Sequence, residues 1–192
     1  MTELGGDFFM SKPKLIIVEA APAGGKSSTT DLLRERMLNT TLFRLSSIGK
    51  DDKYNVFSYH TSILMFLYDM KHSQMNCVMD RSFLSQYVYA RLGYKTHSFE
   101  EETQRLLDRL NTLGLFYDVH LVLLAANKQD FEERLKRDKA QYIEHSVENS
   151  IKQQREYMKV FDEINVPNVH KHVINNSGFT VEQTVETILS YL

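Results

Sequence analysis

Short, continuously apolar runs alternate along the chain with longer stretches in which apolar residues recur every three or four positions. The runs are rich in Leu, Ile and Val, a composition typical of strands buried on both faces of a parallel sheet. They are too short to be complete helices. On this basis strands are predicted at 15–18, 41–45, 76–80, 118–126 and 172–174.

The stretches between these runs have the spacing of amphipathic helices. Leu106, Leu110 and Leu113, for example, fall on one helical face. Helices separating successive strands are typical of a parallel sheet covered on both sides. The pattern therefore predicts an α/β fold with a five-stranded parallel sheet and helices on both faces. The predicted helices are 27–37, 54–71, 82–92, 98–113, 129–137, 141–164 and 181–192.

Composition narrows the class of protein. A chain of 192 residues has the length of one α/β domain, which we expect at 12–192, after a disordered leader at 1–11. The net charge of −2 argues against a basic nucleic-acid binder, so no nucleic-acid partner is expected. Cys77 stands alone and cannot form an intrachain disulfide. The longest apolar run, 121–126, is far below the ~20 residues that cross a bilayer, and we expect a cytoplasmic protein without a membrane anchor.

The first chemical signal follows the first predicted strand. Residues 19–28 read EAAPAGGKSS, which is the P-loop pattern with Ala20 in place of its first glycine. Glycines let backbone N–H groups approach phosphate oxygens, and the lysine reaches the β- and γ-phosphates. A plain glycine-rich turn is disfavoured, because a buried strand precedes the motif and an amphipathic helix follows it. The residues expected to bind the phosphates of ATP are Ala23, Gly24, Gly25, Lys26, Ser27 and Ser28.

A second signal, Asp80-Arg81-Ser82, follows the third predicted strand. The carboxyl ends of parallel strands share one edge of the sheet, so Asp80 and Glu19 are expected near the phosphate loop. Ser27 and Asp80 are the candidate Mg²⁺ ligands, Asp80 directly or through water, and Arg81 is a candidate clamp for an anionic substrate. The alternative is that Asp80 caps a helix or pairs with Arg81.

A third group, Arg134, Lys136, Arg137 and Lys139, lies in the fifth predicted helix and just after it. A mobile arginine can neutralise charge that develops on the γ-phosphate oxygens during transfer. From spacing alone, a solvated helix face in which Glu132 and Glu133 pair with the basic residues is the favoured interpretation.

Residues 14–192 resemble nucleotide kinases of the P-loop kinase superfamily, thymidylate kinases most of all and deoxynucleoside kinases next. Glu19-Ala20 and Asp80-Arg81 match motifs of both families. The resemblance implies the P-loop kinase fold and transfer of the γ-phosphate of Mg·ATP to a deoxynucleoside monophosphate such as dTMP. It implies that Arg44 grips the acceptor phosphate, that Phe57 stacks on the base, and that Asp80 and Arg81 complete the acceptor site.

The same resemblance places Arg134 and Arg137 in the lid. Lys26, Arg81, Arg137 and Glu19 are then the candidate catalytic residues. ATP and a deoxynucleotide or deoxynucleoside are the expected partners, and a homodimer is one assembly considered.

Two alternatives stay open. Ser82 is more typical of deoxynucleoside kinases, whose hydroxyl acceptor needs a general base, a role that Glu19 would take. Pro22 and Thr61 stand where thymidylate kinases usually carry an acidic residue and a base-reading arginine, so the base is not determined. The second alternative is a GTPase-like switch, because residues 127–130 read NKQD and resemble a guanine-reading motif. The absence of a DxxG motif disfavours it.

Overall fold

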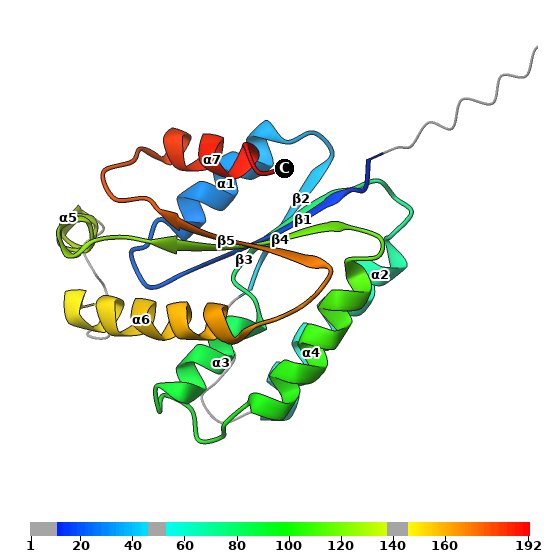
Figure 1. The fold of residues 1–192 in the computed structure, drawn as a ribbon, viewed down its shortest axis with the longest axis horizontal. Coiled ribbons are helices and arrows are strands. Elements are labelled where there is room, and N and C mark those ends of the chain that lie inside the picture. The colour runs from blue at the N-terminus through cyan, green and yellow to red at the C-terminus, as the bar shows by residue number, and fades with distance from the viewer. Residues whose placement is uncertain (1–10, 46–52, 138–145) are drawn as a thin grey trace, which may run out of the picture.

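The structure is a computed structural model that describes residues 11–45, 53–137 and 146–192. Five parallel strands form one sheet in the order β2-β3-β1-β4-β5 (Figure 1). The number of strands and their parallel direction agree with the prediction from the apolar runs. The strands are β1 (Lys14–Ala20), β2 (Thr40–Arg44), β3 (Asn76–Asp80), β4 (Asp118–Ala125) and β5 (Val169–Asn175).

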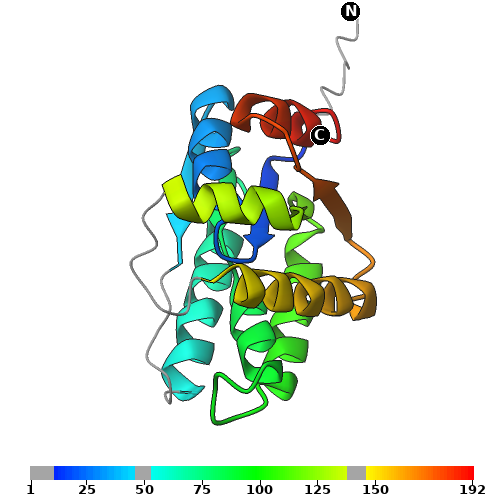
Figure 2. The same cartoon turned by 90° about the vertical axis from the view of Figure 1, so that its left-hand side faces the viewer.

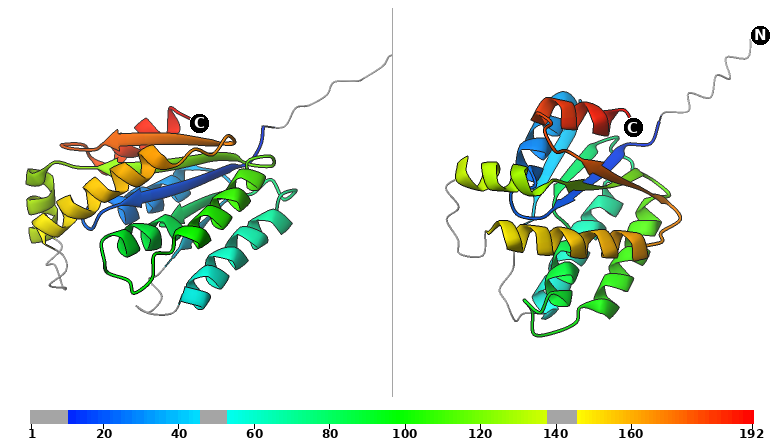
Figure 3. Two further views of the ribbon diagram at one scale, coloured as in Figure 1. Left: turned by 60° about the horizontal axis from the view of Figure 1, so that its bottom comes forward. Right: turned by 60° about the vertical axis from the view of Figure 1, so that its left-hand side comes forward.

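Helices cover both faces of this sheet. Two of them, α1 and α7, pack side by side on one face, and α2, α3, α4 and α6 cover the other (Figures 1 and 3). The short α5 lies at the end of β4. The helices are α1 (Lys26–Arg36), α2 (Lys53–Asp69), α3 (Phe83–Arg91), α4 (Glu100–Leu113), α5 (Lys128–Arg137), α6 (Val147–Glu163) and α7 (Val181–Leu189).

The two-residue period of a strand explains why residues 15–18 of the central strand β1 are all apolar. Leu15 and Ile17 of β1 pack into the core beneath α2, α3, α4 and α6, whereas Ile16 and Val18 pack beneath α1 and α7. All four are at most 1% exposed. A strand buried on both faces has no polar side to show, as the sequence pattern indicated.

Element boundaries differ from prediction mainly at the C-terminal side. β5 begins at Val169 instead of residue 172, because this edge strand carries polar residues, His170 among them, that hide it from an apolar pattern. α6 begins at Val147, after the capping residue Ser146, and the predicted start of that helix at 141–145 lies outside the described residues. α7 ends at Leu189, three residues before the predicted end.

The strand order determines which loops meet. β1 lies between β3 and β4, so the loops that follow β1 and β3 leave the sheet side by side. In open α/β sheets this carboxyl-terminal edge is where ligands bind. Figure 2 faces this edge, with α5 and α6 in front of the strand ends. Among the described helices, none combines the length and the apolar character that a bilayer crossing requires.

Candidate active site

The loop between β1 and α1 has the curled backbone of a phosphate-binding loop. Ala23 and Gly25 both have left-handed dihedral angles, with φ of 59° and 88°, and Gly25 is the N-cap of α1. The Gly24 N–H donates to the Ala21 carbonyl at 3.0 Å and closes the turn. Successive turns of this kind gather backbone N–H groups into a concavity that suits anions, and the positive end of α1 adds to it.

Ala20, the one departure from the P-loop pattern, is accommodated by Gly24. A Cβ atom on Gly24 would lie 2.6 Å from the Ala20 Cβ and 2.9 Å from the Ala21 carbonyl oxygen. These distances are shorter than real Cβ contacts, so the loop closes only because Gly24 has no side chain. Because Ala20 places a Cβ atom at the first motif position, the loop has no room for a side chain at position 24.

Lys26 and Asp80 form a buried ion pair that joins the loop to the end of β3. Their Nζ and Oδ1 atoms are 2.7 Å apart, and the side chains are 8% and 7% exposed. Burial raises the pKa of Asp80, but Lys26 and a hydrogen bond from Ser27 lower it more, so the carboxylate stays ionised with its pKa below the ordinary value. Burial and the charge of Arg81 lower the pKa of Lys26, and Asp80 opposes that change.

Glu19 lies beside this pair but is fully buried. Its Oε1 accepts from the Ser82 N–H and from the Ser82 hydroxyl, both at 2.6 Å, and its Oε2 accepts from the Ser85 hydroxyl at 2.7 Å. Ser85 also shares a hydrogen bond with the Tyr157 hydroxyl at 2.8 Å. Burial raises the pKa of Glu19, opposed by the two serines and by the charges of Arg81 and Lys26. The carboxyl group therefore ties β1 to the start of α3.

Arg81 follows Asp80 with an unusual backbone. Its φ is 76°, and its N–H donates to the Val18 carbonyl at 3.1 Å, which continues the pairing of β1 with β3. Its guanidinium donates to the Tyr89 hydroxyl at 2.6 Å. A non-glycine residue in the left-handed region is uncommon. The strained turn directs the Arg81 side chain toward α3 at the ligand edge of the sheet.

Among the arginines of the predicted lid, Arg134 lies against the phosphate loop. Its Nη1 donates to the Ala23 carbonyl at 3.4 Å, and Nη2 donates to the Asn176 carbonyl at 3.1 Å. Arg137 is exposed at the end of α5, next to residues outside the described part of the chain. The structure thus brings Arg134 to the phosphate loop.

Two of the four residues expected to bind the acceptor, Arg44 and Phe57, come from β2 and α2. Arg44 ends β2, is 57% exposed and pairs with Asp31 of α1. Its register partner in the neighbouring strand is Asp80, so it does lie at the ligand edge. Phe57 of α2 is partly buried against the large core. Ser27 and Ser28 are both exposed at the start of α1.

The residues that resemble a guanine-reading motif are engaged in local structure. The Asn127 side chain accepts from the Asp130 N–H at 2.9 Å, in the manner of a helix cap. The Asp130 carboxylate accepts from the Gly178 N–H at 3.1 Å. A guanine-reading aspartate must instead offer its carboxylate to the base. This geometry disfavours the GTPase-like alternative.

The donor set at this edge fits Mg²⁺. Ser27 offers a hydroxyl oxygen and Asp80 an ionised carboxylate, and Ser27 hydrogen-bonds to Asp80, so the two groups are adjacent. Mg²⁺ prefers such oxygen ligands and retains several waters of its own. Within the described residues, no cluster of three or more His, Cys, Asp or Glu side chains is arranged to hold a metal by itself. A magnesium ion here would consequently depend on nucleotide phosphates for further ligands.

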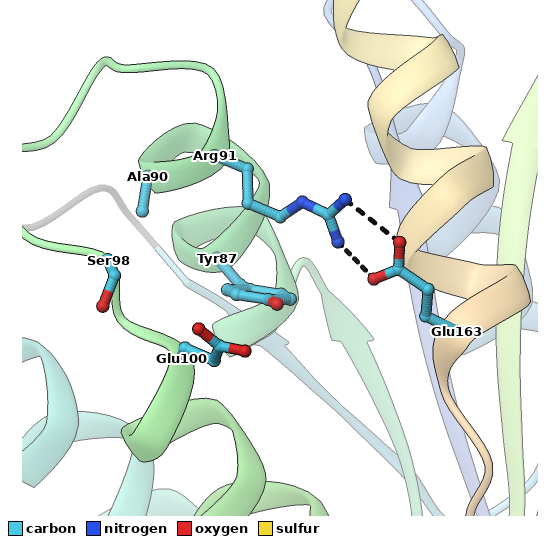
Figure 4. A pocket seen from close by; sticks show the side chains of 6 residues that line it. All are labelled: Tyr87, Ala90, Arg91, Ser98, Glu100 and Glu163. Carbon is cyan, nitrogen blue, oxygen red and sulfur yellow. Dashed lines mark hydrogen bonds and ion pairs between the residues drawn. The ribbon is translucent and has the colours of Figure 1, made fainter.

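A separate hollow of about 380 Å³ lies among α3, α4 and α6 (Figure 4). Arg91 reaches across it and donates to Glu163 at 3.0 Å, and its Nε lies 2.6 Å from Glu156. Two carboxylates thus neutralise its one arginine, and Glu100 adds further negative charge to the lining. None of the predicted site residues lines this hollow, and its charge does not suit a phosphate.

Sequence reasoning missed three residues at the site. Ser85 donates to Glu19 and shares a hydrogen bond with Tyr157. No local pattern identifies these two residues, because α3 and α6 meet only through tertiary packing. Asn176, which donates to the Gly24 carbonyl at 3.0 Å, had a usable signal. It lies in the polar segment 175–178 directly after the fifth predicted strand, and that position lies at the same sheet edge as the phosphate loop.

No protein-family model and no curated protein sequence matches the chain. Solved structures do match. A thymidylate kinase from Candida albicans has a TM-score of 0.57 at 14% identity, over 95% of this chain and 92% of that chain. A deoxyadenosine kinase from M. mycoides has a TM-score of 0.52 at 16% identity, over 92% of this chain and 97% of that chain. A polyphosphate kinase 2 from Arthrobacter aurescens TC1 has a TM-score of 0.58 at 17% identity, over 88% of this chain and 63% of that chain. These likenesses confirm the P-loop kinase fold predicted from the sequence.

Proposed function

We propose that this protein is a phosphotransferase that moves the γ-phosphate of Mg·ATP to a deoxynucleoside monophosphate, with dTMP as the preferred candidate. The observation that carries the proposal is the buried Lys26–Asp80 pair, which joins the phosphate loop to the end of the neighbouring strand. A cation for phosphates and an ionised carboxylate for hydrated magnesium are thereby held at one point. The solved structures that share the fold include a thymidylate kinase and a deoxyadenosine kinase.

On the donor side, the phosphate loop and the start of α1 bind the triphosphate. Lys26 releases Asp80 and stabilises charge on the β- and γ-phosphate oxygens, while Ser27 and Asp80 hold magnesium. When bound, that ion neutralises phosphate charge and orients the γ-phosphate. Most of the rate enhancement then comes from positioning and electrostatic stabilisation.

On the acceptor side, Arg81 and Arg44 are the proposed phosphate ligands. Both lie at the carboxyl ends of neighbouring strands, and Arg44 needs only to exchange Asp31, at an exposed position, for a substrate phosphate. Phe57 is the proposed stacking partner of the base. Arg134 or Arg137 closes over the transferring group in this account.

The state of Glu19 favours a monophosphate acceptor. A general base must accept a proton directly from the attacking hydroxyl, whereas the Glu19 carboxyl is fully buried and accepts three hydrogen bonds from Ser82 and Ser85. An anionic monophosphate needs cations more than a base. Glu19 then serves to hold the end of β1 against the start of α3.

One observation supports a deoxynucleoside acceptor as the second candidate. Burial raises the pKa of Glu19, and a carboxylate with a raised pKa is a stronger base near neutral pH. For this role the Ser82 and Ser85 hydroxyls must turn away and expose a carboxylate oxygen. The two candidates share the donor site and differ only in the acceptor.

An acceptor panel tests the proposal. The purified protein is incubated with Mg·ATP and each nucleoside or nucleoside monophosphate, and the products are separated by chromatography. The proposal predicts a diphosphate product, formed fastest from dTMP. If nucleosides are phosphorylated and nucleoside monophosphates are not, the second candidate is supported instead. If the protein binds GTP and transfers no phosphate to any acceptor, both candidates are contradicted.

A further inference from the structure

Asn176 makes a buried contact with the phosphate loop that none of the functions assigned above uses. It follows β5, is 3% exposed, and its Nδ2 donates to the Gly24 carbonyl at 3.0 Å. Its own N–H donates to the Ala125 carbonyl at 2.8 Å, which anchors its backbone to the end of β4. Asn176 therefore connects the ends of β4 and β5 to the phosphate loop.

Arg134 determines which way the Asn176 amide points. The Arg134 guanidinium has only donors, and its Nη1 lies 3.3 Å from Asn176 Oδ1. The amide oxygen must face this arginine, so the amide NH₂ faces the Gly24 carbonyl. Arg134 also donates to the neighbouring Ala23 carbonyl at 3.4 Å. Two successive carbonyls of the loop are thus held from the outside.

Holding a carbonyl outward aims the next N–H inward. In a trans peptide the C=O and N–H groups point in opposite directions, and no cis peptide occurs among the described residues. The bond from Asn176 to the Gly24 carbonyl therefore directs the Gly25 N–H away from Asn176. Gly25 has a φ of 88°. Glycine adopts positive and negative φ with similar ease, so an external contact is needed to select one orientation of the peptide between Gly24 and Gly25.

We propose that Asn176 is a positioning residue for phosphate binding, which acts by aiming the Gly25 N–H at the bound triphosphate. The inference rests on the proposed function, because it assumes that the loop binds ATP. It assigns to the segment after β5 a role that the P-loop motif does not contain.

The experiment compares Asn176→Leu and Asn176→Asp with the wild-type protein. Leucine has a similar size but neither donates nor accepts, and aspartate keeps the acceptor for Arg134 but loses the donor to Gly24. The matched control is Asn168→Ala, which removes another interelement asparagine bond, from Asn168 Nδ2 to the Asn111 carbonyl at 3.3 Å, at the opposite end of β5. Titration calorimetry measures the Kd of Mg·ATP, steady-state kinetics measures both KM values, and thermal unfolding is recorded for every variant.

For Asn176→Leu the expected result is a Kd and a KM for ATP raised by about three- to tenfold, the effect of one lost hydrogen bond. The acceptor KM stays unchanged, which a general loss of structure would not produce. Asn176→Asp shows at least the same loss, because aspartate also lacks the donor to the Gly24 carbonyl. Asn168→Ala binds ATP as the wild type does.

An ATP Kd within twofold of the wild-type value in a folded Asn176→Leu protein would overturn the inference and leave the proposed function standing. If that variant does not fold, an unchanged ATP Kd in Asn176→Asp has the same meaning. Failure of the wild-type protein to bind ATP would overturn the proposed function, and this inference with it.

Discussion

Lys26 and Asp80 stabilise each other in a position that is almost closed to water, so their contributions to folding and to catalysis can be separated. Removing one partner of a buried pair leaves an uncompensated charge and costs about 3–5 kcal/mol of unfolding free energy, whereas replacing both partners is often neutral. We expect Lys26→Met to be destabilised and Lys26→Met/Asp80→Asn to recover most of that stability in urea titrations. Both variants should lose about 10²–10³-fold or more in turnover, because the phosphate cation is missing from both. Recovery of turnover together with stability would refute the role of Lys26 at the phosphates.

Glu19 provides a pH test at the same scale. Its pKa is raised above 4.5 by burial, so the folded state binds more protons than the unfolded state once the pH exceeds that value. The slope of unfolding free energy against pH is then negative, and stability is lost as pH rises from about 4.5 through the raised pKa. Glu19→Gln cannot ionise and should gain stability relative to the wild type over this range. Urea titrations from pH 4.5 to 8 measure the difference, and a constant difference would contradict the raised pKa.

Kinetics of the same Glu19→Gln variant distinguish the two acceptors. A positioned general base contributes about 10²–10⁴-fold, and only a hydroxyl acceptor needs one. With a monophosphate acceptor no base is required, so we expect a smaller loss. A loss of about a thousandfold would favour the deoxynucleoside kinase.

Arg44 tests the proposed acceptor phosphate. A charge-assisted hydrogen bond is worth about 1.5–3 kcal/mol, so Arg44→Ala should raise the acceptor KM by about ten- to a hundredfold and leave the ATP KM unchanged. Arg36→Ala is the matched control, because Arg36 forms a similar ion pair, with Glu186, at the far end of α1. An acceptor KM that is the same in Arg44→Ala and Arg36→Ala would show that Arg44 does not bind the acceptor.

At the scale of elements, the phosphate loop closes only because Gly24 has no side chain beside Ala20. Gly24→Ala forces the loop apart, which should cost about 1–3 kcal/mol and raise the ATP KM. Ala20→Gly removes the closer of the two obstructing atoms, so the double variant should be more stable than Gly24→Ala alone. A double-mutant cycle by thermal unfolding measures this coupling. Additive effects would show that the Ala20 contact does not limit the loop.

At the scale of the whole molecule, the sheet was predictable because buried parallel strands are apolar on both faces. Leu15–Val18 and the centre of β4 carry that signal, and the P-loop signature lies where a strand passes into a helix. The start of β5 was not predictable, since an edge strand tolerates His170 and other polar residues. The burial of Glu19 by Ser82, Ser85 and Tyr157 was also beyond the sequence, because it depends on how α3 and α6 pack.

A single-turnover experiment with labelled γ-phosphate tests whether this protein transfers phosphate to a nucleotide. Excess protein is mixed with Mg·[γ-³²P]ATP and dTMP, quenched at intervals, and the label is located by chromatography. We expect the label to move from ATP into dTDP in the wild-type protein and transfer to be slowed about 10²–10³-fold or more in Lys26→Met/Asp80→Asn. Label that remains in ATP, or that appears only as inorganic phosphate with dTMP and every other nucleotide or nucleoside acceptor, would contradict the proposed function.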